Sequence, residues 1–126
     1  MKIVPELVVT DVKKAVDFYQ SFFDFELVDK VEVNDAYFWA KMQSKDKDTE
    51  IMFTLLTNAV DEIPELKERN NAGRIVISVE VDDINYFYSR FEKTNFILKD
   101  LYKTDYGTTE FVVKDIDGYI LDVTKR

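Results

Sequence analysis

The sequence of 126 residues contains no cysteine and no histidine. Without cysteine the chain has no disulfide, no thiolate nucleophile and no ligand for an iron–sulfur cluster. Without histidine it lacks the base of a Ser-His-Asp triad and a common ligand of catalytic zinc. Only three glycines occur, so neither a GxGxxG loop nor a P-loop can be written. These absences exclude the most familiar catalytic and nucleotide-binding motifs.

Basic residues are also few: 17 Lys and Arg stand against 25 Asp and Glu, which gives a net charge of -8. This balance argues against broad contact with nucleic-acid phosphates, because such contact depends on Lys and Arg. Pro5 and Glu6 interrupt the opening segment before a signal-like apolar run forms, and no apolar run approaches the roughly 20 residues of a membrane span. We expect a cytoplasmic protein with no nucleic-acid or membrane partner, for which a cationic or neutral small molecule is the easier ligand.

Two segments that lie 72 residues apart share one pattern, since Asp11 and Asp83 each precede an apolar face with i, i+3, i+4, i+7 spacing. This spacing is one face of an amphipathic helix, and the aspartate stands where a carboxylate caps the first turn. The apolar positions are Val12, Ala15, Val16 and Tyr19 in the first copy, and Ile84, Phe87, Tyr88 and Phe91 in the second. The pattern predicts two equivalent helices.

Strand-like segments flank both helices in the same order. They are 3–9, 25–28, 38–40 and 50–56 in the first half, and 75–81, 97–99, 110–112 and 119–124 in the second. Each half therefore predicts strand–helix–strand–strand–strand, an α+β unit. We expect a single domain over 1–126, with module 1 at about 1–58, a connector with one helical turn at about 57–72, and module 2 at about 73–126. Chance likeness of two βα units is the alternative to duplication.

Strand alternation predicts which side chains lie on the sheet faces away from the helices. These side chains are Glu50, Met52 and Thr54 in the first half, and Val76, Ser78, Glu80, Ile120, Asp122 and Thr124 in the second. The mixture of apolar, hydroxyl and carboxylate groups suits a pocket with a few polar anchors. An ordinary hydrated sheet face would show the same alternation.

Aromatic and acidic residues supply further candidates. Consecutive strand residues cannot all face inward, so either Phe38 or Trp39 must point to the second face. Tyr106 precedes Gly107 in a predicted loop that could close over a flat ligand. Glu80, Glu110 and Asp122 would converge if the halves paired about a pseudo-twofold axis, and carboxylates can hold a hard cation or act as acid and base. A buried tryptophan and a surface tyrosine are the plainer alternative.

The segments 7–19 and 23–26 resemble the opening of the vicinal oxygen chelate superfamily, the glyoxalase, bleomycin-resistance protein and extradiol dioxygenase group. The segment 110–119 resembles its closing strand–turn–strand, and with 74–91 the similarity covers nearly the whole chain. The resemblance implies two tandem βαβββ modules that form curled mixed sheets with the helices on the outer face. It also implies a dimer whose sheets surround ligand cavities.

The chain departs from the metal-dependent members of that superfamily. Their ligand stands eight residues before the first apolar helix position of each half, where this chain has Val4 and Val76. Asp122 matches the late carboxylate position, whereas the early one falls near Met52 or Thr54. One candidate ligand in four positions does not make a metal site. We therefore expect no metal and no cofactor, which disfavours the metal-dependent glyoxalase, fosfomycin-transferase and dioxygenase activities.

The remaining resemblance is to the metal-free bleomycin-resistance branch, through Pro5, Trp39 and 106–111. It implies a homodimeric binding protein that sequesters an amphipathic or cationic ligand in a dimer cleft, with a role in antibiotic resistance and no catalytic residue. The ligand-binding residues we expect are Phe38, Trp39, Thr54, Ser78, Glu80, Tyr106, Glu110 and Asp122. The alternatives are an atypical lyase or isomerase of this superfamily that uses the carboxylates, and an interaction module with filled clefts.

Overall fold

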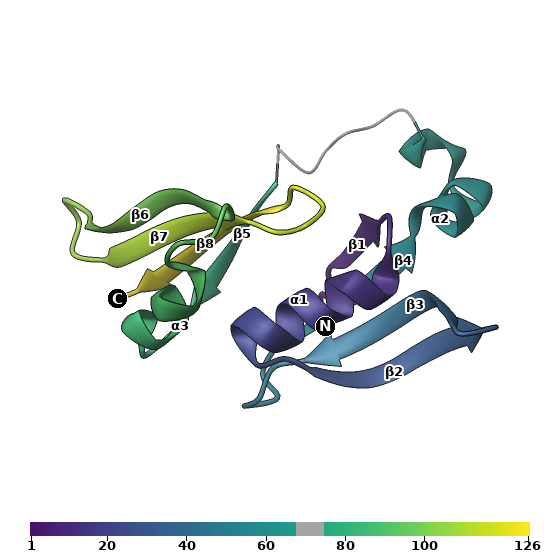
Figure 1. Ribbon diagram of the computed structural model, residues 1–126, viewed down its shortest axis with the longest axis horizontal. Helices are drawn as coiled ribbons and strands as arrows, with labels where there is room; N and C mark the ends of the chain where they lie inside the picture. The colour runs from purple at the N-terminus through teal and green to yellow at the C-terminus, as the bar shows by residue number, and fades with distance from the viewer. Residues whose placement is uncertain (68–74) are drawn as a thin grey trace. The chain divides into compact units, whose positions relative to one another are not determined.

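The computed structural model describes residues 1–67 and 75–126 (Figure 1). The chain divides into two compact units, 1–69 and 70–126. The described part of each unit contains one four-stranded sheet. In each sheet the first strand pairs in parallel with the last, and the other neighbours are antiparallel. The predicted α+β architecture of tandem βαβββ modules is therefore confirmed.

The first sheet has the strand order β1-β4-β3-β2, and α1 packs against β3 and β4 (Figure 1). The bounds are β1 Glu6–Val9, α1 Val12–Phe23, β2 Glu26–Val33, β3 Ala36–Gln43 and β4 Glu50–Leu55. Asp11 caps α1 as predicted, because its carboxylate accepts a hydrogen bond of 3.0 Å from the backbone N–H of Lys14. On the buried face of α1, the ring of Tyr19 lies 5.1 Å from that of Phe53. Phe53 is completely buried and forms the centre of this core.

The hairpin between β2 and β3 has two distinct irregularities. Asn34 and Asp35 both have positive φ, of 51° and 66°, as the tight primed turns of hairpins require. Further along, Trp39 pairs with Val31 but Tyr37 pairs with Glu32, so Phe38 has no partner in the β2–β3 register. Phe38 therefore lies in a β-bulge, where simple alternation of side chains stops.

The connector contains more helix than the single turn predicted. After β4 the chain forms α2 (Leu56–Glu62) and then a short 3-10 helix, η1 (Pro64–Leu66). Ala59 is the only buried residue of α2, and η1 has none. Residues 68–72 of the predicted connector, and 73–74 of the predicted second module, lie outside the described residues.

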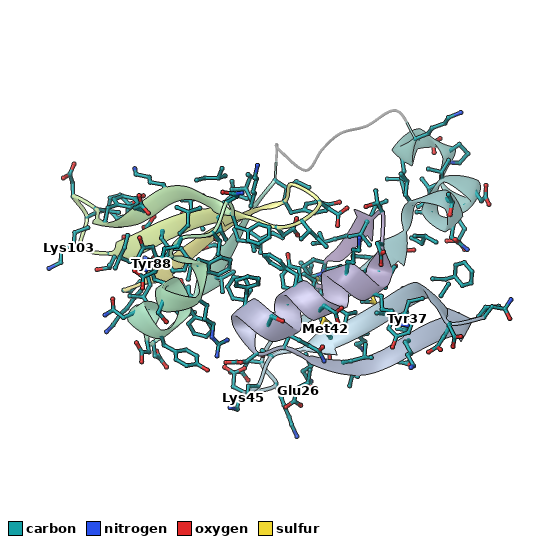
Figure 2. The ribbon with its side chains drawn as sticks, viewed as in Figure 1. Glu26, Tyr37, Met42, Lys45, Tyr88 and Lys103 are labelled. Carbon is teal, nitrogen blue, oxygen red and sulfur yellow. The ribbon has the colours of Figure 1, made fainter. Side chains whose placement is uncertain are left out.

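The second sheet repeats the first, with the order β5-β8-β7-β6 and α3 against β7 and β8 (Figure 1). The bounds are β5 Val76–Glu80, α3 Ile84–Phe91, β6 Ile97–Lys103, β7 Thr109–Lys114 and β8 Ile120–Lys125. Asp83 caps α3 by accepting from the N–H of Tyr86 at 3.1 Å. The rings of Phe91 and Tyr88 lie 5.7 and 5.2 Å from that of Phe111, and Tyr88 is labelled in Figure 2. Phe111 is fully buried, so the α3 side of this sheet forms its core.

The registers show which positions of the two sheets correspond. Val8, Thr54 and Trp39 form one cross-strand row in the first sheet. Glu80, Thr124 and Glu110 form the equivalent row in the second. Trp39 therefore corresponds to Glu110, 71 residues later, rather than to Phe111 at the uniform offset of 72 that the sequence predicts. The difference arises before the second strand of each unit, because α3 is four residues shorter than α1 and the loop that follows it is three residues longer.

The same registers show that one buried cross-strand pair has its large and its small side chain on opposite strands in the two units. Ala40 pairs with Phe53 in the first sheet, whereas Phe111 pairs with Val123 in the second. All four side chains are fully buried. The large residue of the pair is thus on the fourth strand of one unit and on the third strand of the other. Each core keeps one aromatic ring at this position, which preserves its packed volume.

Candidate functional site

The candidate site lies on the face of the second sheet that is opposite α3. Phe111 and Val123 point toward α3, so alternation places Glu110, Asp122 and Thr124 on the other face. Tyr102 of β6 is the cross-strand partner of Glu110 and extends the row. We call Glu110, Asp122, Tyr102, Tyr106 and Thr108 the carboxyl cluster.

Glu110 is the centre of the carboxyl cluster and is only 5% exposed. Three hydroxyl groups donate to its carboxylate: Thr108 at 2.5 Å, Tyr102 at 3.2 Å and Tyr106 at 3.3 Å. The hydrogen bond from Thr108 is the main reason that the pKa of Glu110 lies below its ordinary value, and burial opposes this effect. Glu110 is therefore held as a buried, ionised carboxylate.

Thr108 is oriented by a neighbouring threonine. The two side-chain oxygens of Thr104 and Thr108 lie 2.7 Å apart, and Thr108 N–H donates to Thr104 Oγ1 at 3.1 Å. Because the hydroxyl proton of Thr108 is directed to Glu110, Thr104 donates in the hydroxyl–hydroxyl bond. The turn between β6 and β7 therefore fixes one donor of the carboxyl cluster before any ligand arrives.

Asp122 lies beside Glu110 on the neighbouring strand, and each carboxyl group shifts the pKa of the other. The pKa of Asp122 is raised, first by burial and then by the negative charge of Glu110, while Lys99 acts in the opposite direction. Two neighbouring carboxylates resist ionising together, so one of them takes up a proton before the other as pH falls. That one is Asp122, because the three hydroxyl donors favour the anion of Glu110.

Two oxygens on this face have no hydrogen-bond partner. Asp122 Oδ1 and Thr124 Oγ1 are both buried, and no donor or acceptor in the described residues reaches them. Thr124 as a whole is only 4% exposed. A buried polar atom without a partner costs free energy of about 1–3 kcal/mol, so each such atom calls for a physical explanation.

The charged side chains at the edge of the carboxyl cluster already have partners. Arg126 Nε lies 2.9 Å from Glu80 Oε1, and both side chains are exposed. Lys99 Nζ stands 3.8 Å from the centre of the Tyr102 ring, a cation–π contact. The cations nearest to the carboxyl cluster therefore have other partners.

The structure brings together some of the residues expected from the sequence. Tyr106, Glu110 and Asp122 belong to one cluster, whereas Ser78 and Glu80 are exposed on β5, next to β8. Glu110 and Asp122 meet on neighbouring strands of a single sheet. Their proximity therefore needs no pairing of the two halves.

The other expected residues lie in the first unit. Trp39 and Thr54 are cross-strand partners and both are partly buried. Trp39 is flanked by Val31 on β2, which is 49% exposed. Lys41 follows two residues later and lies 3.4 Å from Glu50 Oε2, which Lys2 also approaches at 2.7 Å. This face is thus apolar around Trp39 and ionic at its margin.

The residues that hold the carboxyl cluster together were not all identifiable from the sequence. Thr124 was placed on this face by alternation, but Tyr102, Thr104 and Thr108 were missed as hydroxyl partners. Thr108 stands two residues before Glu110, a spacing that puts both on one side of an extended chain, so a signal existed. Tyr102 gave none, because the β6–β7 register is irregular between Lys99 and Tyr102.

The residues present do not fit the metal of the metal-dependent proteins that the sequence resembles. Val4 and Val76 have no donor atom, and Val76 is 63% exposed. Across residues 1–67 and 75–126, no group of three or more Asp or Glu side chains is placed to hold a metal ion. The Glu110 carboxylate already accepts three hydroxyl hydrogen bonds. Most of the acceptor positions of this carboxylate are therefore occupied before any cation binds.

The comparisons with known proteins bear on the whole chain. A family model described as "Glyoxalase/Bleomycin resistance protein/Dioxygenase superfamily" matches residues 3–123. No curated protein matches the sequence. None of the helices in the described parts has the length and apolar character required to cross a membrane.

Several solved structures are similar at low sequence identity. TioX from Micromonospora sp. ML1 is 19% identical with a TM-score of 0.75, over 99% of this chain and 98% of that one. A protein of unknown function from Agrobacterium tumefaciens str. C58 is 15% identical with a TM-score of 0.80, over 100% and 94%. A member of the same superfamily from Sphaerobacter thermophilus DSM 20745 is 18% identical with a TM-score of 0.72, over 100% and 98%. These likenesses show the fold.

Proposed function

Because the chain belongs to the glyoxalase/bleomycin resistance protein/dioxygenase superfamily, we propose that it has no metal centre and binds a small amphipathic or cationic molecule. In this respect it would act like the bleomycin-resistance branch, by sequestering its ligand. The single observation that carries the proposal is the pair of neighbouring carboxyl groups of Glu110, which is buried, and Asp122, which is half-buried. Its hydroxyl support and its two unpartnered oxygens suit recognition of a ligand with hydrogen-bond donors.

The aromatic residues support an amphipathic ligand. Tyr106 is 74% exposed while its hydroxyl donates to Glu110, so its ring is available for stacking beside the carboxylate. Trp39 offers a second aromatic surface in the first unit, next to Thr54. We assign the other expected residues, Phe38, Ser78 and Glu80, to the margins of these two faces. The net charge of -8 favours a cation over an anion.

An enzymatic function is the second candidate, and the opposite pKa shifts of Glu110 and Asp122 favour it specifically. A carboxylate beside a protonated carboxyl can serve as base and acid in a lyase or isomerase. However, Glu110 is held as an anion by three donors, which makes it a weak base. Glyoxalase and extradiol assays with and without added divalent cations separate this candidate from binding, since turnover would favour the enzyme.

A cytoplasmic homodimer with a role in antibiotic resistance completes the proposal. Light scattering of the purified protein tests the dimer: a mass of twice 14.9 kDa supports it, and the mass of one chain contradicts it. Growth of cells that produce the protein, in the presence of each compound that binds, tests resistance.

A thermal-shift screen that includes bleomycin-type glycopeptides and small aromatic amines tests the proposed function. A ligand that binds only the folded protein at 100 times its Kd stabilises it by about 2.7 kcal/mol, which raises Tm. We expect Glu110→Gln and Trp39→Ala to lose the shift while remaining folded. The matched controls are Glu92→Gln, which is exposed just after α3, and Tyr37→Ala, which is on β3. If no compound raises Tm, or if the controls lose as much as the test variants, the proposal fails.

A further inference from the structure

We propose that the carboxyl cluster is a site for a primary ammonium group, which donates to the buried, unpartnered oxygens of Asp122 and Thr124. This inference rests on the proposed function and makes it more specific: it names the chemical class of the ligand and predicts that binding releases a proton. A metal ion and an anion are both excluded by the donor set described above.

The first argument is the distribution of hydrogen bonds at the carboxyl pair. Glu110 accepts from Thr108, Tyr102 and Tyr106, and these hydrogen bonds favour its anion. Asp122 lies beside that anion and has one buried oxygen without a donor. A cation with an N–H donor supplies the missing hydrogen bond and offsets the negative charge of the pair.

The second argument comes from the unpartnered oxygens. Asp122 and Thr124 are two residues apart on β8, so their side chains share one face of the sheet. Asp122 Oδ1 and Thr124 Oγ1 are buried without partners, and Thr124 is an independent signal because it is not acidic. A primary ammonium has three donors in a compact group. It can donate to the Asp122 carboxylate and to Thr124, which a quaternary ammonium cannot do.

The charged side chains around this site do not occupy it, so a cation from solution can. Lys99 of β6 contacts the ring of Tyr102, and Arg126 is paired with Glu80 of β5. Ser78 of β5 is the neutral cross-strand partner of Asp122. Helix α3 packs on the opposite side of the sheet, against Phe111. Neither neighbouring cation is directed to the unpartnered oxygens.

The exchange conserves charge and atoms. Below its raised pKa, Asp122 of the free protein is mainly the neutral acid; in the complex it is the carboxylate, ion-paired with R–NH₃⁺. The proton that leaves Asp122 passes to solvent, so up to one proton is released for each ammonium bound, according to the pH. No covalent bond between protein and ligand forms or breaks.

The direct test is carboxyl NMR of the full-length protein labelled with ¹³C in aspartate and glutamate. The titration of the free protein first locates the pH at which Asp122 is half protonated. At that pH we add phenethylammonium, the neutral analogue 2-phenylethanol, or the quaternary analogue trimethylphenethylammonium. We expect only the primary ammonium to move the Asp122 resonance to its ionised position. An Asp122 that titrates like an ordinary aspartate, or that responds equally to 2-phenylethanol, overturns the inference.

Calorimetry in two buffers of different ionisation enthalpy supplies the proton count. Wild-type protein is expected to release protons on binding phenethylammonium, so the observed heat depends on the buffer. Asp122→Asn keeps an amide donor toward Glu110 but has no proton to release. We expect at least about tenfold weaker binding, about 1.4 kcal/mol, and no buffer dependence. The control Asp105→Asn, at an exposed position between β6 and β7, should behave as wild type.

The outcomes separate this inference from the function on which it rests. If neutral or quaternary compounds bind as tightly as the primary amine, small-molecule binding stands and the ammonium site is wrong. If the amine binds without proton release, the exchange is wrong. If the amine does not bind but other compounds in the screen raise Tm through Glu110, the ammonium site alone is wrong. If no compound of any class binds, the proposed function fails as well.

Discussion

Glu110 and Asp122 differ by one methylene group, yet their surroundings push their acidities in opposite directions. Glu110 receives three hydroxyl hydrogen bonds, which lower its pKa. Asp122 has a buried oxygen without a donor and lies beside the charge of Glu110, which raises its pKa. At the scale of single residues, donor count therefore matters more than the chemical type of the side chain.

This difference predicts an effect of pH on stability. The pKa of Asp122 is higher in the folded than in the unfolded chain. The contribution of Asp122 to the free energy of unfolding therefore falls as pH rises from 3.8, its ordinary pKa, through the raised pKa. Asp122→Asn removes that loss. We therefore expect the free energy of unfolding of Asp122→Asn, minus that of wild type, to increase with pH above about 4 and then to level off.

Urea unfolding at a series of pH values measures this difference. The opposite sign applies to Glu110, whose stabilising contribution is present above its ordinary pKa of 4.5 and is lost as pH falls through the lowered value. Asp105→Asn controls for the change of one carboxyl group to an amide. A difference between Asp122→Asn and wild type that stays constant with pH would show that the two carboxyl groups titrate normally.

At the scale of elements, the β2–β3 hairpin contains avoidable strain. Asp35 has a φ of 66° and its neighbour Asn34 a φ of 51°. A left-handed conformation is costly for residues with a Cβ, whereas glycine adopts it freely. We expect Asp35→Gly to raise the free energy of unfolding by about 0.5 kcal/mol, after subtraction of the added entropy of the unfolded chain.

Asp48→Gly is the matched control for this prediction. Asp48 is equally exposed in the β3–β4 loop but does not have positive φ. The same substitution there only loosens the unfolded chain, so we expect a loss of about 0.4–1 kcal/mol. Chemical denaturation compares the two variants. Equal losses in both would mean that the turn at Asp35 carries no strain.

At the scale of the whole molecule, the two cores hold one cross-strand pair in two forms. Ala40 and Phe53 in the first unit correspond to Phe111 and Val123 in the second. The pair of the second unit can be placed in the first by the double substitution Ala40→Phe and Phe53→Val. Since overpacking alone costs about 1–3 kcal/mol and loss of a buried ring costs more, each single change should destabilise the protein.

The double variant is expected to recover at least about 1 kcal/mol relative to the sum of the single losses, because the ring volume is restored within the same core. A double-mutant cycle measured by urea unfolding gives this coupling energy. Additive losses would show that the pairs of the two units are not interchangeable. The prediction concerns the core face of the sheets and leaves the carboxyl cluster untouched.

The features that the sequence predicts well are those with a short-range physical cause. Both helices were expected from their apolar spacing and from the caps Asp11 and Asp83, and the faces of the strands followed from alternation. The β-bulge at Phe38 and the pairing of Tyr102 with Glu110 were not predictable, because they depend on register irregularities set by packing. The sequence therefore identified Glu110 and Asp122 as candidates but not the hydroxyl groups that separate their acidities.

Corresponding positions in the two sheets now hold very different groups. The row position that is Trp39 in the first sheet is Glu110 in the second, and both stand beside a threonine of the last strand, Thr54 or Thr124. A backbone position that occurs twice in one chain can carry a different side chain in each copy without a change of topology. The repeated sheet thus presents an indole in one unit and a carboxylate in the other, on two frames with the same strand order.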